Sequence, residues 1–181
     1  MRRLICIAVL LALSAPARAE VSPERAARAL AGYENPVTAE RVRALGPGWE
    51  KAMAALLKDS ATRPMLRPRA IAALGFSKEA LTAALLRELL AAKGAATEGL
   101  PVIETREAVK SLAAVDGVRA LPELRRFLEH PVYDVRAQAA RSLGEVGGAP
   151  AREALAARLG RENEEAVRIE IKGALARLGG K

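Results

Sequence analysis

The chain has 181 residues, a formal net charge of +8, and a composition that is 51% hydrophobic but only 3% aromatic. Sheets favour β-branched and aromatic residues, so this composition disfavours a sheet and favours closely packed helices. The hydrophobic fraction is large enough for a core that needs no disulfides. The basic excess favours contact with anionic surfaces without identifying one.

The first 19 residues have the three-part pattern of a secretory signal peptide. Met1-Arg2-Arg3 is basic, residues 4–15 are apolar and uncharged, and Ala17-Arg18-Ala19 places small residues where a signal peptidase reads them. The apolar run is shorter than the roughly 20 residues that a membrane anchor needs. We therefore expect cleavage after Ala19 and a periplasmic or secreted mature chain. A buried N-terminal helix is the alternative.

The single cysteine of the chain, Cys6, lies within this leader. Ile5 and Ile7 flank it, whereas a lipoprotein signal places small residues before its cysteine, so we expect no lipid anchor. Residues 20–181 contain no cysteine, which excludes a disulfide or a thiolate metal site there. Removing the three leader arginines from the net charge of +8 leaves +5, a modest basic excess.

The first expected helix of the mature chain begins at Ser22. Ser22-Pro23-Glu24 offers a capping hydroxyl, a proline at the first helical position and an acid in the first turn. Ala27 and Leu30 are its main apolar residues, so we expect the first helix pair to be the weakest.

Five segments of nine residues, the first of them weaker, align on a shared leucine. Successive leucines are 29, 38, 31 and 32 residues apart. A period near 30 residues is the length of a helical hairpin with its turns, within the range of about 20 to 50 residues that is typical of solenoid repeats. The segments are residues 38–46, 67–75, 105–113, 136–144 and 168–176, aligned on Leu45, Leu74, Leu112, Leu143 and Leu175.

Each aligned segment predicts a helix, because its apolar residues recur at helical spacing. In the fourth copy, Val135, Ala139 and Leu143 fall at i, i+4 and i+8. Partner helices between the copies show apolar stripes of their own. These stripes are Trp49, Met53, Leu56 and Leu57; Leu81, Leu85 and Leu89; Leu121, Leu124 and Leu128; and Leu155 with Leu159.

Turns rich in glycine and proline separate the stripes, as at residues 46–48 and 147–150 and at Asp116-Gly117. The longest leucine spacing includes residues 95–101, which we expect to form a loop insertion. In the fifth copy, Lys172 stands where the other copies have an apolar residue. Terminal repeats of solenoids need a polar outer face, so Lys172 indicates that the array ends there. Its apolar counterparts are Val42, Ile71, Val109 and Ala140.

The fourth copy carries Val118-Arg119-Ala120-Leu121-Pro122-Glu123-Leu124, then Asp134-Val135-Arg136, Ala139-Ala140 and Leu143-Gly144. These residues resemble the HEAT-repeat family, specifically the short bacterial repeats first associated with phycobilisome lyases. The resemblance covers roughly residues 20–181. It implies an all-α solenoid of about five helical hairpins whose second helices line a concave wall. It implies no particular activity, because such repeats serve many purposes.

The requirements of the related enzymes are not met. Deoxyhypusine hydroxylases, which resemble this fold, hold two irons with several His-Glu pairs, whereas this chain has a single histidine, His130. Bilin lyases act in the cytoplasm, which does not fit an exported chain. Residues 94–99 lack the lysine of a phosphate loop, and residues 75–79 lack the second glycine of a nucleophile elbow. We therefore expect no catalytic, cofactor-binding or metal-binding residue.

Three polar features are expected to be structural. His130 precedes Pro131 at a helix C-terminus, where a partly cationic ring would suit the helix dipole. Ser77 is expected to cap the helix that follows it. The acidic cluster Glu162, Glu164 and Glu165 is expected to be the solvated start of the last helix.

Two basic rows are predicted along the concave wall. Arg67, Arg136 and Arg168 share the first position of their copies, where Thr38 and Thr105 stand in the others; Arg43, Lys110 and Arg141 share another position. One alternative for Arg136 and Arg168 is a ladder of hydrogen bonds to the acids or carbonyls of neighbouring repeats. The alternative for the second row is ordinary solvated charge. The residues proposed to bind a partner are Arg67, Arg106, Lys110, Arg136, Arg141 and Arg168.

The leading hypothesis is an exported, non-catalytic scaffold that binds a protein partner on the concave wall. The alternative is a binder of anionic envelope polymers or lipids, whose affinity would fall steeply with salt. Nucleic acid is disfavoured, because the chain is expected to be exported and no aromatic residue interleaves the arginines to stack bases. We expect no transmembrane segment in the mature chain, and the sequence leaves the oligomeric state open.

Overall fold

The computed structural model describes residues 19–32 and 34–179. These residues form ten α-helices and one 3-10 helix, and no strand occurs among them. The leader expected over residues 1–19 lies, apart from Ala19, outside the described residues. The helices are α1 (Pro23–Leu30), α2 (Ala39–Arg43), α3 (Trp49–Lys58), α4 (Leu66–Leu74), α5 (Ala80–Lys93), α6 (Gly99–Asp116), η1 (Gly117–Ala120), α7 (Leu121–Phe127), α8 (Tyr133–Val146), α9 (Ala149–Leu159) and α10 (Glu165–Gly179).

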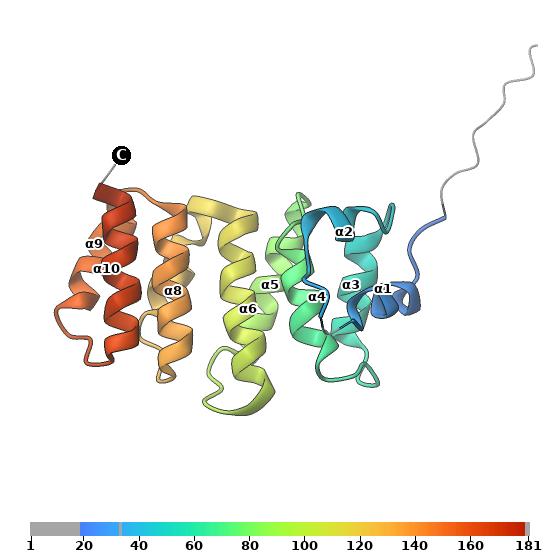
Figure 1. The fold of residues 1–181 in the computed structure, drawn as a ribbon, viewed down its shortest axis with the longest axis horizontal. Coiled ribbons are helices and arrows are strands. Elements are labelled where there is room, and N and C mark those ends of the chain that lie inside the picture. Colours follow the sequence, from blue (N-terminus) through green and yellow to red (C-terminus); the bar gives the residue numbers. More distant parts are fainter. Residues whose placement is uncertain (1–18, 33, 180–181) are drawn as a thin grey trace, which may run out of the picture.

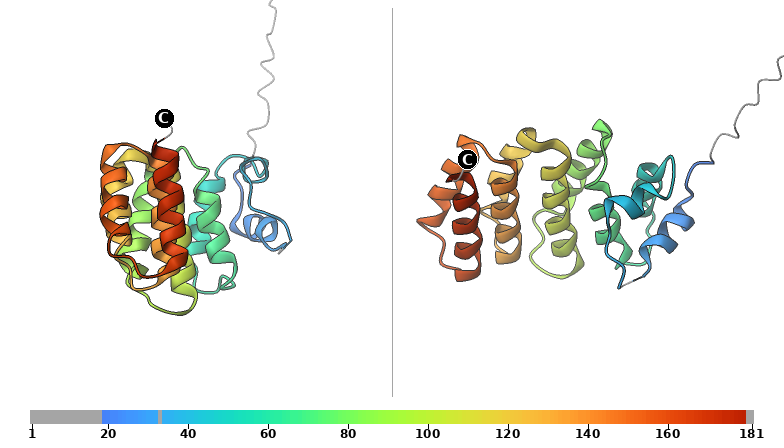
Figure 2. Two further views of the ribbon diagram at one scale, coloured as in Figure 1. Left: turned by 60° about the vertical axis from the view of Figure 1, so that its left-hand side comes forward. Right: turned by 45° about the horizontal axis from the view of Figure 1, so that its top comes forward.

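From α3 onward, consecutive helices pack as antiparallel hairpins that stand side by side in a single row, and α1 packs on α3 and α4 (Figure 1). In each hairpin after the first pair, the odd-numbered helix forms the rear layer and the even-numbered helix the front layer of Figure 1. An end-on view shows the two layers (Figure 2). The fold is therefore an all-helical, HEAT-like solenoid, as predicted.

The stack curves toward its second helices. Helices α4, α6, α8 and α10 contact their successive neighbours far more extensively than the first helices contact one another. A stack whose one layer is more closely spaced bends toward that layer. The exposed face of α4, α6, α8 and α10, called here the inner wall, is therefore the concave side.

The first pair is the weakest, as expected from its few apolar residues. Helix α1 has eight residues and α2 has five. Ser22 caps α1 as predicted, since its hydroxyl accepts a hydrogen bond from the Arg25 N–H at 3.3 Å. The chain after α1 then lies against α4, where Arg69 donates hydrogen bonds to the carbonyls of Leu30 at 2.7 Å and Gly32 at 3.1 Å.

The shared leucines mark the core. Leu74, Leu112 and Leu143 are almost completely buried, and Leu45 and Leu175 are partly buried at the two ends of the array. The position before each core leucine is small, and this lets the second helices approach closely. Ser111 uses that position to donate a hydrogen bond to the Ile71 carbonyl of the preceding repeat at 2.9 Å.

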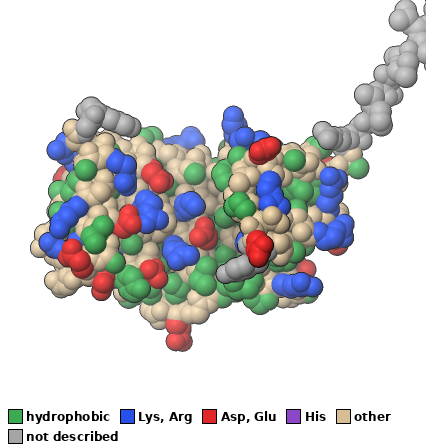
Figure 3. Space-filling view, in the orientation of Figure 1, with side chains coloured by type: hydrophobic (Ala, Val, Ile, Leu, Met, Phe, Trp, Pro, Cys, Tyr) green, Lys and Arg blue, Asp and Glu red, His purple; other side chains and the backbone are tan. Residues whose placement is uncertain are grey.

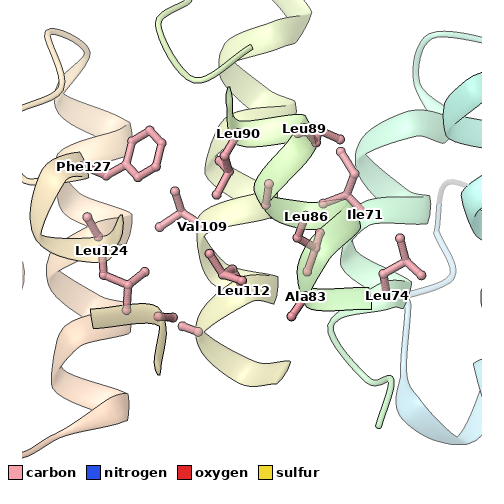
Figure 4. Packing of buried hydrophobic residues seen from close by; sticks show 14 of the residues in the cluster. Ile71, Leu74, Ala83, Leu86, Leu89, Leu90, Val109, Leu112, Leu124 and Phe127 are labelled. Carbon is pink, nitrogen blue, oxygen red and sulfur yellow. The ribbon is translucent and has the colours of Figure 1, made fainter. Parts of the chain in front are cut away.

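The predicted stripe of α5 is wrong at its first member. Leu81 is 79% exposed, and the buried face of α5 consists of Thr82, Ala83, Leu86, Leu89 and Leu90. Figure 4 shows Leu86, Leu89 and Leu90 in the core near Ile71 of α4 and Val109 of α6. Alanine and leucine occupy most positions of α5, so two different faces of this helix are apolar. Packing against α6 buries the face with Leu86 and Leu90 rather than the face with Leu81 and Leu85.

Residues 95–101 are not all loop. Helix α6 begins at Gly99, so residues 99–101 form its first turn. Pro101 is tolerated there because the N–H groups of a first helical turn have no acceptor within the helix. The predicted turn at Asp116-Gly117 is confirmed, since α6 ends at Asp116 and Gly117 has a φ of 53°.

Lys172 is exposed on α10, whereas its counterparts Val42, Ile71, Val109 and Ala140 are buried against the following repeat. The polar outer face that the sequence predicted for the last repeat is therefore confirmed.

Candidate functional site

The first-position arginines are held by intramolecular hydrogen bonds. Arg136 donates from Nε to Glu162 Oε2 at 2.8 Å and from Nη2 to Glu162 Oε1 at 3.0 Å. Its Nη1 donates to the carbonyls of His130 at 2.9 Å and Pro131 at 2.8 Å. One guanidinium thus joins the turn before α8 to the next repeat.

The acceptor Glu162 corrects the prediction of a solvated acidic start to the last helix. Its side chain is 1% exposed, whereas Glu164 and Glu165 are exposed. Arg158 donates a second set of hydrogen bonds to it, and the Glu164 N–H donates at 2.9 Å. Burial raises the pKa of Glu162, but the hydrogen bonds from Arg136, the Glu164 N–H and Arg158 outweigh this effect and lower it to about 2.

Arg67 of the second copy also bonds to an acid of the next repeat, whereas Arg168 of the fifth copy bonds to carbonyls of its own turn. Arg67 Nε donates to Oε1 of the fully buried Glu104 at 2.7 Å, and Lys93 pairs with the other carboxylate oxygen. Arg168 Nη1 donates to the carbonyls of Leu159 at 3.2 Å and Glu162 at 3.0 Å. Arg136 thus makes the bond to a neighbouring repeat that the sequence offered as the ladder alternative, whereas the acceptors of Arg168 lie in its own hairpin.

The threonines at the first position also form hydrogen bonds that stabilise the start of their helices or the preceding turn. The Thr105 hydroxyl donates to the Lys93 carbonyl at 3.2 Å, and Thr38 caps α2 by accepting from the Arg41 N–H at 3.3 Å. Sequence reasoning missed Glu104 and Glu162 as acceptors, because they occupy different positions in their repeats. The sequence did offer a signal for Glu104. This acid directly precedes Thr105, at a position where other copies have an apolar residue.

The second basic row lies on the exposed side of the inner wall. Arg141 forms a two-pronged ion pair with Glu170 of the next repeat, with Nε 3.2 Å from Oε2. Hydrogen bonds across this pair raise the pKa of Arg141 and lower the pKa of Glu170. Arg106 Nη2 lies 3.7 Å from Glu107 Oε1, too far for a hydrogen bond.

Lys110 and Arg43 are exposed. Among the described residues, neither forms an ion pair with a carboxylate. Of the six residues proposed to bind a partner, three are held by hydrogen bonds to turns or buried acids (Arg67, Arg136 and Arg168), and Arg106, Lys110 and Arg141 present charge on the wall. Partner binding by these residues stays a prediction. Figure 3 shows basic and acidic side chains interspersed over this face.

His130 corrects another prediction. It is 6% exposed, and its Nδ1 accepts a hydrogen bond from the Val132 N–H at 3.1 Å. An imidazole nitrogen that accepts a hydrogen bond carries no proton, so the ring is neutral rather than partly cationic. Burial lowers the pKa of His130, in agreement with this geometry.

The N-cap residue of α5 is Glu79, so the prediction that Ser77 caps this helix is wrong, and Ser77 lies in the turn before it. Its hydroxyl oxygen accepts from the Glu79 N–H at 3.0 Å and from the Thr82 hydroxyl at 2.9 Å. Within residues 19–32 and 34–179, no three histidine, cysteine, aspartate or glutamate side chains cluster as metal ligands would. Nor does that part of the chain contain a helix with the length and apolar character of a membrane span.

Residues 102–176 match the family model described as HEAT repeats. The chain therefore contains a HEAT-repeat region. It runs from the first turns of α6 to α10 and includes Arg106, Lys110, Arg136, Arg141 and Arg168 of the inner wall. HEAT repeats are generally protein-interaction scaffolds and usually non-catalytic. No curated protein and no solved structure is significantly similar to the chain.

Proposed function

We propose that this protein is an exported, non-catalytic scaffold that binds a protein partner on the inner wall. The observation that carries the proposal is the wall itself. Helices α6, α8 and α10 of the HEAT-repeat region form one continuous face, and its outward side chains are available for contact. Because each repeat contacts only its neighbours, such a surface is broad and regular enough for an extended partner.

The basic residues of the second helices fall into two groups, one that stabilises the fold and one that presents charge, and this supports the proposal. Arg67, Arg136 and Arg168 stabilise the turns and the junctions between repeats, so they keep the wall rigid. Arg106 and Lys110 make no hydrogen bond to a neighbouring repeat and present their charge for contact with a partner. A rigid wall with free charges binds with little loss of conformational entropy, because fewer groups become ordered on binding.

Export is supported by the basic, apolar and small-residue segments of residues 1–19. The test is expression of the full chain in its own host, followed by N-terminal sequencing of the protein from the envelope and the medium. We expect the mature protein to begin at Glu20. A cytoplasmic protein that retains Met1-Arg2-Arg3 would contradict export and leave the binding proposal intact.

A second candidate function is binding of an anionic polymer or lipid headgroup of the envelope. The exposed Arg43 and Lys110 favour it, because they add positive charge and neither forms an ion pair with a described carboxylate. Against it, Glu107, Glu145 and Glu170 lie among the same rows, so the wall is mixed in sign rather than uniformly basic.

The two candidates are separated by cross-linking capture from the native envelope at low and at high salt, with mass spectrometry of the products. The scaffold predicts one protein recovered in similar amount at both salts, and reduced recovery with the double variant Arg106→Glu and Lys110→Glu. Arg152→Glu on α9 is the matched control, since it reverses an exposed charge on a first helix. Recovery of polymers alone, lost at high salt, would favour the second candidate.

A further inference from the structure

The rear layer of the stack is open beside α5. Helix α1 contacts α3 and α7 contacts α9, but α3 and α5 make few contacts with each other. A groove of about 380 Å³ lies between α3 and α5, on the side of the molecule opposite the inner wall (Figure 1). It is called here the outer groove, and its apolar surface consists of Ala54 of α3 and Leu81, Ala84 and Leu85 of α5.

Leu81 is the feature of the outer groove that a monomer does not explain. It is 79% exposed, the highest exposed fraction of any large apolar side chain among the described residues. A single exposed leucine is ordinary on a protein surface. This one adjoins Ala84 and Leu85 in a groove, and an apolar concavity of that kind is typical of a surface that another protein surface covers.

The two sides of the outer groove carry opposite charges. Helix α3 contributes Lys51 and Lys58, whereas α5 and its N-cap contribute Glu79 and Glu88. Within the described part of the chain, Lys58, Glu79 and Glu88 form no ion pair. Lys51 pairs with Glu20 at 3.1 Å, but both side chains are largely exposed, so this pair adds little to stability and can exchange partners.

Helices α3 and α5 run in the same direction and begin at the same level. The chain reverses from α3 into α4 and again from α4 into α5, so α5 begins beside the start of α3. Burial, and in addition the nearby charge of Glu79, raises the pKa of Glu50 in the first turn of α3, which agrees with this placement. Lys58 follows Glu50 by eight residues, a rise of about 12 Å. Glu88 follows Glu79 by nine residues, about 13.5 Å, so Lys58 and Glu88 lie level at the far end of the groove.

A second copy of the chain can face the outer groove through a two-fold axis in two orientations. With the axis across the helices, each helix faces its own equivalent in reverse, and Lys51 meets Lys58 of the other copy. With the axis along the helices, α3 of one copy faces α5 of the other, and Lys58 meets Glu88. Like charges that face each other oppose association, whereas opposite charges favour it. The charges therefore select the second orientation.

We propose that the outer groove joins two copies of this chain in a symmetric dimer, with α3 of each copy facing α5 of the other. Every contact is made twice, so the dimer contains two pairs of Lys58 with Glu88, and Leu81 of each copy packs toward α3 of the other. The inner walls lie in the opposite layer and stay uncovered. The inference is therefore independent of the proposed scaffold function.

The first test is analytical ultracentrifugation of residues 20–181, which contain every described helix, over a range of concentrations. We expect a reversible equilibrium between monomer and dimer. Leu81→Asp should weaken dimerisation at least about tenfold, because two leucines lose their apolar burial and two charges are added. Val118→Asp is the matched control, since Val118 is 67% exposed on η1 and lies outside the outer groove. It should dimerise as the wild type does.

The second test reverses the charges one side at a time. Lys58→Glu alone and Glu88→Lys alone should each weaken the dimer about tenfold or more, because two attractions become two repulsions. A mixture of the two variants restores both pairs in a heterodimer. Tagged Lys58→Glu should therefore retain untagged Glu88→Lys on an affinity resin, but should not retain untagged Lys58→Glu. Far-UV circular dichroism checks that each variant is folded.

A chain that is monomeric at every concentration would overturn the proposal. So would a dimer that Leu81→Asp and Val118→Asp affect equally, since the contact would then lie elsewhere. If Leu81→Asp dissociates the dimer but the mixture of charge variants does not associate, the pairing of α3 with α5 is wrong. In each of these cases, capture of a partner on the inner wall would still decide the scaffold function separately.

Discussion

Glu162 is the residue on which the junction between the last two repeats depends. It is buried, and it accepts hydrogen bonds from Arg136 and Arg158, which belong to different repeats. Replacing it with glutamine removes the charge and turns one of its two acceptor oxygens into an NH2 donor that faces two largely buried guanidinium groups. We expect Glu162→Gln to destabilise the folded chain by about 3 kcal/mol in urea unfolding followed by circular dichroism. Glu164→Gln, on an exposed neighbour, should change the stability little.

The pH dependence of stability gives a second readout for the same residue. The pKa of Glu162 in the folded chain, about 2, lies below its ordinary value of 4.5, so its ionised form stabilises the fold. That contribution is fully present above pH 4.5 and is lost as the pH falls from 4.5 toward 2. The stability difference between wild type and Glu162→Gln should therefore shrink over this range. A constant difference would show that the carboxylate charge is not what Arg136 and Arg158 require.

His130 permits a direct test by NMR, because it is the single histidine of the chain. Burial lowers its pKa, and protonation of Nδ1 would break the hydrogen bond from the Val132 N–H. The neutral ring therefore stabilises the fold above the ordinary histidine pKa, and this contribution is lost as the pH falls below it. We expect the imidazole signal to titrate with a midpoint below 6.5. A midpoint at or above 6.5 would restore the cationic ring that the sequence suggested.

At the scale of the element, the approach of neighbouring second helices depends on small residues. A Cβ atom added at Gly144 of α8 would lie 2.7 Å from the Ala174 Cβ of α10 and 2.9 Å from its Cα. Backbone cannot yield as a flexible side chain can, so the helices would have to separate. We expect Gly144→Ala to destabilise the chain by about 2 kcal/mol in urea unfolding.

Gly173 of α10 provides the matched control for Gly144. Its added Cβ would meet nothing nearer than the Arg177 guanidinium at 3.7 Å. Glycine is a poor helix former, so Gly173→Ala should stabilise the chain by about 0.5 kcal/mol or more. Equal effects of the two substitutions would mean that helix propensity, not interhelical spacing, decides the outcome at Gly144.

A helix could be predicted from the sequence where its buried positions repeat along the chain, and not where contact with another helix decides its buried face. Helices aligned on Leu74, Leu112 and Leu143 were predictable, because their buried positions repeat along the chain. The face of α5 was not, since alanine and leucine fill both of its candidate stripes and only contact with α6 selects Leu86 and Leu90. At the site, the basic positions were predictable from the repeat, but the acceptor of Arg136 was not. Glu162 lies in a turn, where no repeat register applies.

At the scale of the whole molecule, stability should vary along the row of repeats. In a solenoid each repeat is stabilised by its own packing and by contact with its neighbours, so a repeat with weak contacts opens independently. Helices α6 and α8 are held on both sides by other second helices, whereas α1 and α2 are short and make fewer contacts. The exposed wall that we propose binds a partner therefore belongs to the most stable part of the array.

Hydrogen–deuterium exchange followed by mass spectrometry measures this gradient. Peptides from α1 and α2 should exchange first, and peptides from α6 and α8 last, because opening either central helix disrupts two interfaces at once. In Gly144→Ala, exchange should accelerate in α8 and α10 while α3 and α4 keep their wild-type rates, since the perturbed interface lies between α8 and α10. Uniform acceleration through all helices would contradict nearest-neighbour stabilisation. The chain would then unfold as one cooperative unit, and a partner bound on α6, α8 and α10 would also stabilise α1 and α2.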